Sequence, residues 1–290
     1  MTIRQKINES RARLVSAGID NGEAGRDCGL LARHVLGWDR AELMTRENDE
    51  ATPAFIERLD PMIERRARRE PVAYIRGEQE FWSRDFAVNR SVLIPRPETE
   101  LIIEELLGYL PADLPQRACR ILHIGTGSGC LAVTAAAEIP LAHVTATDIS
   151  APALAVARGN AERHGVADRI TFVECAYVSH SESPFDFLLS NPPYVTESEY
   201  QNLAPEVREY EPALALVAGD DGFRDIRQIV DIASHQLAPG GVALIEIGYQ
   251  HADAVADLVM GFAALTLKKI SNDLQCIPRV AIIERKITTP

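Results

Sequence analysis

The sequence predicts an α/β fold with a mostly parallel seven-stranded sheet, preceded by a small helical bundle. From Pro97 onward, short apolar runs alternate with amphipathic segments, which is the pattern of strands joined by helices on both faces of a sheet. Residues 1 to 80 instead contain segments with the length and period of helices. We therefore expect a helical domain over residues 1 to 80, a β-hairpin linker over residues 81 to 95, and a larger domain over residues 96 to 290.

The composition is that of an ordinary soluble protein, with 46% hydrophobic and 25% charged residues in a chain of 290. The N-terminus has no apolar signal segment and the apolar runs are too short to cross a bilayer, so we expect a cytoplasmic protein outside the membrane. The five cysteines form no CxxC pair, which indicates reduced thiols and no structural metal. A net charge of -12 disfavours stable binding to nucleic acid.

Four helices are expected in the first domain. Thr52 is a suitable N-cap for the last of them, with Pro53 at its first position, and Pro61 should kink or split it. The expected helices span residues 3 to 17, 24 to 36, 40 to 44 and 53 to 69.

A hairpin and seven strands are expected beyond residue 80. Residues 81 to 95, FWSRDFAVNRSVLIP, alternate apolar and polar side chains around the turn-like VNRS, which predicts a hairpin there. The expected strands of the sheet span residues 119 to 124, 143 to 148, 170 to 174, 185 to 190, 241 to 247, 265 to 270 and 280 to 284.

A glycine loop follows the first of these strands. Its residues are Gly125, Thr126, Gly127, Ser128 and Gly129, and glycines there let the backbone approach a ligand at the N-terminus of the next helix. The third glycine comes too early for a dinucleotide fingerprint, and the loop has no GK[ST]. The GxGxG spacing is typical of S-adenosylmethionine (AdoMet) enzymes, although a tight turn without a ligand is the alternative.

Asp148 ends the second strand, where an acidic side chain can bridge the two hydroxyls of a ribose. Its alternative role is the N-cap of the following helix. Ser150, followed by Pro152, is at least as good a cap, which would leave Asp148 free for the ligand.

The sequence SNPPYV follows the fourth strand, at the edge of the sheet where open α/β folds bind ligands. Pro192 and Pro193 lack N–H groups, so the segment presents the Asn191 side-chain oxygen and the Pro192 carbonyl as acceptors. Two acceptors match the two donors of a planar NH2 group, over which Tyr194 can pack. The pattern predicts methyl transfer to such a nitrogen by orientation and charge stabilisation, and a structural proline turn is the alternative.

The whole chain resembles the release-factor glutamine N5-methyltransferases of the PrmC/HemK type, through FWSRDFAV, VLIPRPETE, GTGSG, SNPPYV, VREYEPALAL, DGFRDIRQI and IEIG. The resemblance implies a Rossmann-like class I AdoMet-dependent methyltransferase domain and a helical N-terminal domain that helps to dock the substrate. It implies methylation of the glutamine side-chain amide in the GGQ motif of class 1 peptide chain release factors, in translation termination, with S-adenosyl-L-homocysteine as the second product. We expect a monomer.

The resemblance also implies roles for individual residues. Gly125 to Gly129 and Asp148 would hold AdoMet with Asn191, and Tyr177 would lie by the adenine. Asn191 to Tyr194 would hold the glutamine, with Asn191, Pro192 and Tyr194 as the catalytic residues. Substrate contacts at the pocket rim would come from Arg96, Glu98 and Glu211, although Pro97 to Glu100 also makes a good helix start and Glu211 a plain turn residue.

Three positions depart from the family's pattern. His123 stands where an acid is expected to hold the cationic methionine end of AdoMet, so affinity should suffer and should fall as the histidine titrates between about pH 5 and 8. Ala176 stands where an aspartate is expected near the adenine, and Glu174 could replace it only if its strand shifts. Cys276 stands where a glycine is expected near the C-terminus.

Two other classes of protein stay open. A DNA or RNA amino-group methyltransferase of the N6-adenine type would share GxGxG and NPPY, but it should carry a basic face. The basic cluster of this chain is most simply a solvated helix face, with ribosomal RNA or an acidic partner as the alternative. The other class is a noncatalytic binding protein with impaired cofactor affinity. The residues of the basic cluster are Arg65, Arg66, Arg68 and Arg69.

Overall fold

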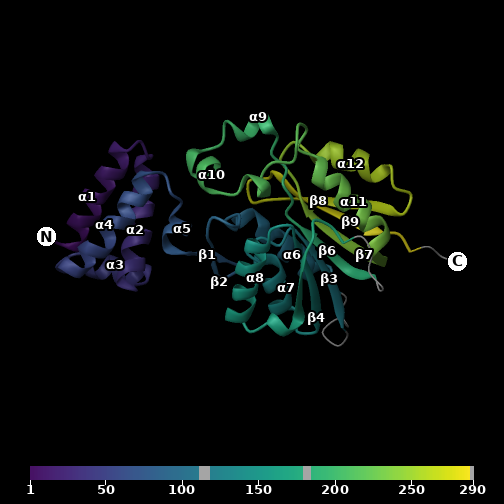
Figure 1. The fold of residues 1–290 in the computed structure, drawn as a ribbon, viewed down its shortest axis with the longest axis horizontal. Helices are drawn as coiled ribbons and strands as arrows, with labels where there is room; N and C mark the ends of the chain where they lie inside the picture. The colour runs from purple at the N-terminus through teal and green to yellow at the C-terminus, as the bar shows by residue number, and fades with distance from the viewer. Residues whose placement is uncertain (111–117, 179–183, 288–290) are drawn as a thin grey trace. The chain divides into compact units, whose positions relative to one another are not determined.

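The chain folds into two units, which are described separately (Figure 1). The structure is a computed structural model that describes residues 1–110, 118–178 and 184–287. Unit 1 contains Met1–Glu78 and Ala204–Tyr210, and unit 2 contains Gln79–Leu203 and Glu211–Pro290. The division into a docking domain, a linker and a catalytic domain remains a prediction.

Unit 1 is a helical bundle around an apolar core, to which Leu14, Leu31, Leu59 and Ile63 contribute buried side chains. Its first four helices begin at side-chain caps, because Thr and Asp oxygens satisfy the free N–H groups of a first turn. Thr52 is one of these caps, as predicted. The helices of unit 1 are α1 (Ile3–Ser16), α2 (Asn21–Leu36), α3 (Arg40–Arg46), α4 (Pro53–Ala67), α5 (Val72–Arg76) and α10 (Pro205–Tyr210).

Helix α4 runs through Pro61 without a break, so the possibility that this proline splits the helix is wrong. Proline removes one main-chain hydrogen bond and crowds the preceding turn. Leu59 and Ile63 are buried on either side of it, and their packing in the core offsets that cost.

The expected solvated basic face is wrong for Arg66, which lies in the interior of unit 1 with 2% of its surface exposed. Its Nε donates to Asp27 Oδ2 and its Nη2 to Glu23 Oε1, both at 2.6 Å. Glu206 of α10 accepts from the same guanidinium at 3.1 Å. A buried guanidinium without such partners would carry a large desolvation cost, so these acids and Arg66 stabilise unit 1 together.

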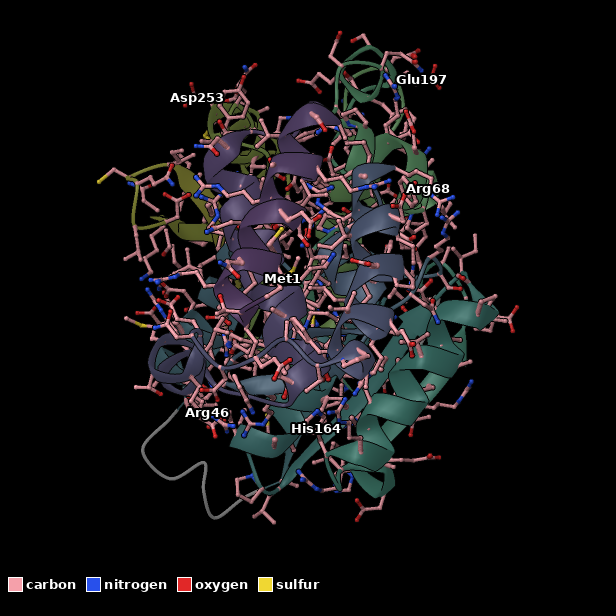
Figure 2. All side chains as sticks on the ribbon, turned by 90° about the vertical axis from the view of Figure 1, so that its left-hand side faces the viewer. Met1, Arg46, Arg68, His164, Glu197 and Asp253 are labelled. Carbon is pink, nitrogen blue, oxygen red and sulfur yellow. The ribbon has the colours of Figure 1, made fainter. Side chains whose placement is uncertain are left out.

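The neighbours of Arg66 in the basic cluster are also largely paired within unit 1. Arg65 forms a bidentate pair with Glu70 at 2.8 Å, and Arg69 lies 3.2 Å from Glu206. Arg68 is exposed, and its side chain extends from the surface in Figure 2. Most of the charge of the cluster is therefore neutralised by the protein's own carboxylates.

The hairpin lies earlier than expected, in the strands β1 (Glu78–Phe81) and β2 (Arg84–Ala87). Its turn consists of Trp82 and Ser83, with φ of 52° and 56°. Two left-handed residues match the twist of the strands in a two-residue hairpin. The sequence did not reveal this turn, because such turns usually contain glycine or asparagine and this one contains neither. The VNRS segment does turn, through a hydrogen bond from Val92 N to Asn89 O, but residues 88–95, all described, form no second strand.

Unit 2 contains the seven-stranded sheet, in the order β5-β4-β3-β6-β7-β9-β8. Neighbours from β5 to β7 are parallel, and the pairs β7/β9 and β8/β9 are antiparallel, so the mostly parallel sheet is confirmed. The strands are β3 (Cys119–Ile124), β4 (Ala142–Asp148), β5 (Ile170–Glu174), β6 (Phe185–Ser190), β7 (Leu237–Glu246), β8 (Leu265–Asn272) and β9 (Pro278–Arg285).

Helices cover both faces of this sheet (Figure 1). Alternate strand residues divide between the faces: Ile121 packs with α6 and α7, whereas Leu122 packs with α11 and α12. None of the helices in the described part of the chain is long and apolar enough to cross a membrane. The helical segments of unit 2 are η1 (Pro97–Thr99), α6 (Glu100–Gly108), α7 (Cys130–Glu138), α8 (Ala151–Arg163), η3 (Ala167–Arg169), α9 (Glu197–Tyr200), η4 (Ala213–Ala215), α11 (Arg224–Gln236) and α12 (Ala252–Met260).

Cys276, in the turn between β8 and β9, adopts a left-handed conformation with φ of 62°. A Cβ atom in this conformation costs about 1 to 2 kcal/mol of folding free energy. Glycine removes that cost but loses more backbone entropy on folding, so the net stabilisation is smaller. We expect Cys276→Gly to stabilise the protein by about 0.5 to 1 kcal/mol in urea unfolding. Cys276→Ala keeps the Cβ atom and should leave stability near that of the native chain. Equal stabilities of the glycine and alanine variants would contradict the strain.

Candidate active site

A cavity of about 460 Å³ lies in unit 2, beyond the carboxyl ends of β3, β4 and β6. This volume is within the range of small-molecule sites. Four predicted site residues, all within the described part of the chain, lie off its wall: Glu98, Gly129, Tyr194 and Glu211. The predicted site residues that line it are Arg96, Gly125, Thr126, Gly127, Ser128, Asp148, Tyr177, Asn191, Pro192 and Pro193.

The first four residues of the glycine loop, Gly125 to Ser128, line the cavity just before α7. Gly125 and Gly127 have φ of 73° and 53°, which allows the sharp turn out of β3. Gly129, with φ of 83°, serves a different purpose, because a Cβ atom there would lie 3.1 Å from the Cα atom of Ala157 in α8. Gly129 thus allows the loop and α8 to approach closely.

Asp148 lies at the end of β4 with its carboxylate against the glycine loop. Its Oδ2 accepts from Gly127 N at 2.8 Å, and its Oδ1 accepts from Ser150 N at 2.9 Å. Ser150 is the N-cap of α8, as the sequence indicated. Asp148 is therefore not the cap but is held in place by two amides, and each of its oxygens keeps a further lone pair for a ligand hydroxyl.

Asn191 follows β6 and lines the cavity beside the two prolines. Its Nδ2 donates to Thr99 Oγ1 at 3.0 Å. This leaves Oδ1, on the other side of the amide, as the acceptor for a ligand. An amide fixed in this way can accept from a planar NH2 group, as the sequence predicted for this segment.

Thr99 connects Asn191 to a buried carboxylate. The hydroxyl of Thr99 donates to Glu246 Oε2 at 2.7 Å, and Tyr194 Oη donates to Glu246 Oε1 at 3.3 Å. Burial raises the pKa of Glu246 to about 7, although both hydrogen bonds act against the increase. Burial and the Glu246 carboxylate raise the pKa of Tyr194 as well. The hydroxyl of Tyr194 therefore forms its hydrogen bond with Glu246, outside the cavity wall. The expected packing of Tyr194 over a planar group of the ligand stays a prediction.

The three predicted rim residues have different positions. Arg96 lines the cavity and its guanidinium pairs with the Glu211 carboxylate, which is 5% exposed. Glu211 Oε2 also accepts from Ile94 N at 3.0 Å. Glu211 thus holds Arg96 and the segment that leads to it, whereas Glu98 is partly buried away from the wall.

At the end of the cavity beside β5, the edge strand of the sheet, the lining residues are Ala176, Tyr177 and Asp225. Tyr177 donates its hydroxyl proton to Asp225, whose other oxygen pairs with Arg224 at 2.9 Å. Glu174 is exposed at the end of β5 and does not contribute to the described cavity wall. Asp225 is therefore the carboxylate at this end, and it can accept a hydrogen bond from an amino group that Ala176 cannot.

His123 lines the cavity but is 1% exposed, and its Nδ1 lies 3.0 Å from Thr126 Oγ1. Burial lowers the pKa of His123 to about 3. The imidazole is neutral between pH 5 and 8, so the expectation that its titration weakens cofactor binding in this range is wrong. The sequence could not show this, because burial at the end of β3 depends on the packing of the sheet.

Comparison with known proteins identifies the family. Residues 5–77 match the PrmC N-terminal domain, and residues 103–208 match the methyltransferase small domain. A release factor glutamine methyltransferase of Bradyrhizobium diazoefficiens is 38% identical, over 98% of this chain and 96% of that relative. One of Nitratidesulfovibrio vulgaris is 38% identical, over 100% of this chain and 97% of the relative. The chain belongs to the release factor glutamine methyltransferase family.

Membership in the release factor glutamine methyltransferase family confirms the resemblance seen in the sequence. A solved methyltransferase structure from Pyrococcus furiosus matches with a TM-score of 0.52 and 20% identity, over 72% of this chain and 91% of that one. At that identity the likeness concerns the fold alone, and it confirms the methyltransferase fold of unit 2.

Three residues of the site were missed in the sequence: Thr99, Asp225 and Glu246. Glu246 had a signal, because it is a lone acid in the apolar strand segment GVALIEI. Thr99 lies inside an expected helix start and Asp225 in an amphipathic helix, where polar residues are ordinary. Their role in the site depends on contacts with residues that are distant in the sequence.

The buried His123 predicts a specific acid sensitivity. Its folded pKa of about 3 is below the ordinary 6.5, so the unfolded chain takes up this proton first and stability falls as pH falls below about 6.5. Between pH 7 and pH 5 we expect the native protein to lose about 2 kcal/mol more than His123→Gln, which has no imidazole. Urea unfolding of both proteins at the two pH values measures this. Parallel losses would show that His123 is not held neutral.

Proposed function

We propose that this protein transfers a methyl group from AdoMet to the side-chain amide nitrogen of the glutamine in the GGQ motif of class 1 release factors. The observation that carries the proposal is the anchored amide of Asn191, which presents an acceptor to a cavity that also contains Asp148 and the glycine loop. The identity to release factor glutamine methyltransferases over nearly the whole chain supports the same substrate class.

The cavity fits AdoMet in size and in its polar groups. The Asp148 carboxylate, oriented by Gly127 N and Ser150 N, is suited to the ribose hydroxyls. Tyr177 lies at the end suited to the adenine, and the glycine loop admits the backbone close to the ligand. When bound, AdoMet supplies an electrophilic methyl group on its sulfonium.

The protein's contribution to the transfer is orientation and charge stabilisation. Asn191 Oδ1 and the Pro192 carbonyl accept the two N–H donors of the glutamine amide, which directs the face of the nitrogen toward the methyl group. As the new N–C bond forms, the S–C bond electrons stay on sulfur and the nitrogen becomes positive. The same two acceptors stabilise that charge until the nitrogen releases one proton to water.

The alternative classes lose support from the structure. The basic cluster expected on a nucleic-acid methyltransferase is largely paired with carboxylates in unit 1. The part of the impaired affinity that was expected from a cationic imidazole loses support, because burial lowers the pKa of His123 to about 3. The weaker affinity expected from the missing acid at this position stays a prediction. The absence of stable nucleic-acid binding, the monomeric state and the cytoplasmic location remain predictions.

Asn191→Ala tests the proposed role of the amide. Because an orienting acceptor acts mainly in the transition state, we expect kcat to fall about 100- to 1,000-fold while the Kd for AdoMet stays within about threefold. Mass spectrometry of a release factor incubated with enzyme and AdoMet measures the methylation, and calorimetry measures Kd. Asn202→Ala, an exposed asparagine outside the cavity, is the matched control. Near-native turnover of Asn191→Ala would rule out the assigned role.

We also propose that residues 1 to 80 dock the release factor, since unit 1 has its own core and none of the cavity residues. In hydrogen exchange of the full chain, adding release factor should slow exchange in peptides from α1 to α5. AdoMet alone, as the control, should slow exchange around the glycine loop but leave those peptides unchanged. Protection by release factor confined to unit 2 would contradict the docking role.

A further inference from the structure

Asn191 is held by a chain of hydrogen bonds that ends on a buried carboxylate. Its Nδ2 donates to Thr99 Oγ1 at 3.0 Å, and the Thr99 hydroxyl donates to Glu246 Oε2 at 2.7 Å. Tyr194 Oη donates to the second oxygen, Oε1, at 3.3 Å. Thr99 and Glu246 are each 2% exposed, so water does not compete freely for these bonds.

The direction of each bond in this chain follows from its donors. The NH2 group of Asn191 can only donate, and a threonine hydroxyl has one proton. When that proton goes to an ionised Glu246, Thr99 can only accept from Asn191. If the Asn191 amide were flipped, so that Oδ1 and Nδ2 exchanged places, Oδ1 would face Thr99 Oγ1, whose proton is already donated to Glu246. The carboxylate thus selects the amide orientation through Thr99.

We infer that Thr99 and Glu246 are positioning residues that keep the Asn191 oxygen turned toward the substrate amide. The inference rests on the proposed function and assigns it two residues beyond the NPPY segment. Neither residue forms a bond to the transferred methyl group; each acts through Asn191. Tyr194 contributes by occupying the other oxygen of Glu246, which limits rotation of the carboxylate.

Protonation of Glu246 removes this selection. A protonated Glu246 can donate to the Thr99 oxygen. The Thr99 hydroxyl then no longer has to donate to Glu246, and it can donate to the Oδ1 of a flipped Asn191. Burial raises the pKa of Glu246 to about 7, so the productive orientation is favoured above about pH 7 and lost as pH falls. The charged and titratable groups that act on or are affected by this carboxylate are Arg279 of β9, Glu98 of η1, Cys130 of α7 and Tyr194.

Two substitutions of Thr99 separate its hydroxyl from its volume. Thr99→Val keeps the shape but removes the bridge, and we expect kcat to fall about 100-fold with the Kd for AdoMet within about threefold. Thr99→Ser restores the hydroxyl and should recover most of the lost turnover. Methyl transfer to a release factor and calorimetry give the two quantities. Equal kcat in the two variants, or loss of AdoMet binding in parallel with kcat, would overturn the inference.

The pH profile gives a readout that a purely structural role would not change. In the native protein kcat should rise with pH through an apparent pKa near that of Glu246. In Glu246→Gln the side chain cannot ionise, so this transition should disappear and kcat should be low throughout. An unchanged transition in Glu246→Gln would show that another group controls the profile.

A spectroscopic measurement tests the hydrogen-bond chain without any methylation. The side-chain NH2 signals of Asn191 in ¹⁵N-labelled protein are identified by their absence from Asn191→Asp. They should shift with a midpoint near pH 7 in the native protein, and this transition should be absent in Glu246→Gln. A native protein that shows the transition but does not methylate release factors refutes the proposed substrate alone. A native protein without the transition refutes the positioning role.

Discussion

The parallel pairing of β3 with both β4 and β6 is the constraint on which the site depends. It aligns Ile124 at the end of β3 with Thr147 of β4 and Ser190 at the end of β6, so the three strands end within one residue of each other at the same edge of the sheet. Helix α7, which follows β3, packs on one face of the sheet, and α11, which lies between β6 and β7, packs on the other face. Connections that diverge in this way open a crevice at the carboxyl edge of the sheet. The glycine loop, Asp148 and Asn191 come together for this reason, although they are far apart in the sequence.

The site combines rigid backbone with buried polar side chains. Asp148 is held by two amides and Asn191 by the hydroxyl of Thr99, so neither needs to be ordered by the ligand. Preorganised acceptors of this kind lose little entropy when the reaction proceeds. The cost is a buried carboxylate at Glu246, whose raised pKa shows that its two hydrogen bonds do not fully replace water.

Unit 1 shows the same use of buried charge for a structural purpose. Arg66 is enclosed by Asp27, Glu23 and Glu206, and the last of these comes from α10, 140 residues later in the chain. Removing one partner of such a group leaves an uncompensated charge, which is far more costly than the pair itself is stabilising. The network therefore specifies that α10 belongs with the helices of unit 1.

The sequence by itself determined the strands, the caps and the motif positions. The strands at 119–124, 170–174 and 185–190 have the expected bounds, and Thr52 and Ser150 are caps, because apolar period and capping are local properties. The tertiary structure decided the burial of Arg66, the neutral state of His123 and the bonds from Thr99 to Asn191 and Glu246. The two partners are 92 positions apart in the sequence in the first of these bonds and 147 positions apart in the second. Charge state and side-chain orientation follow from burial and from such distant partners, which no local pattern in a single chain contains.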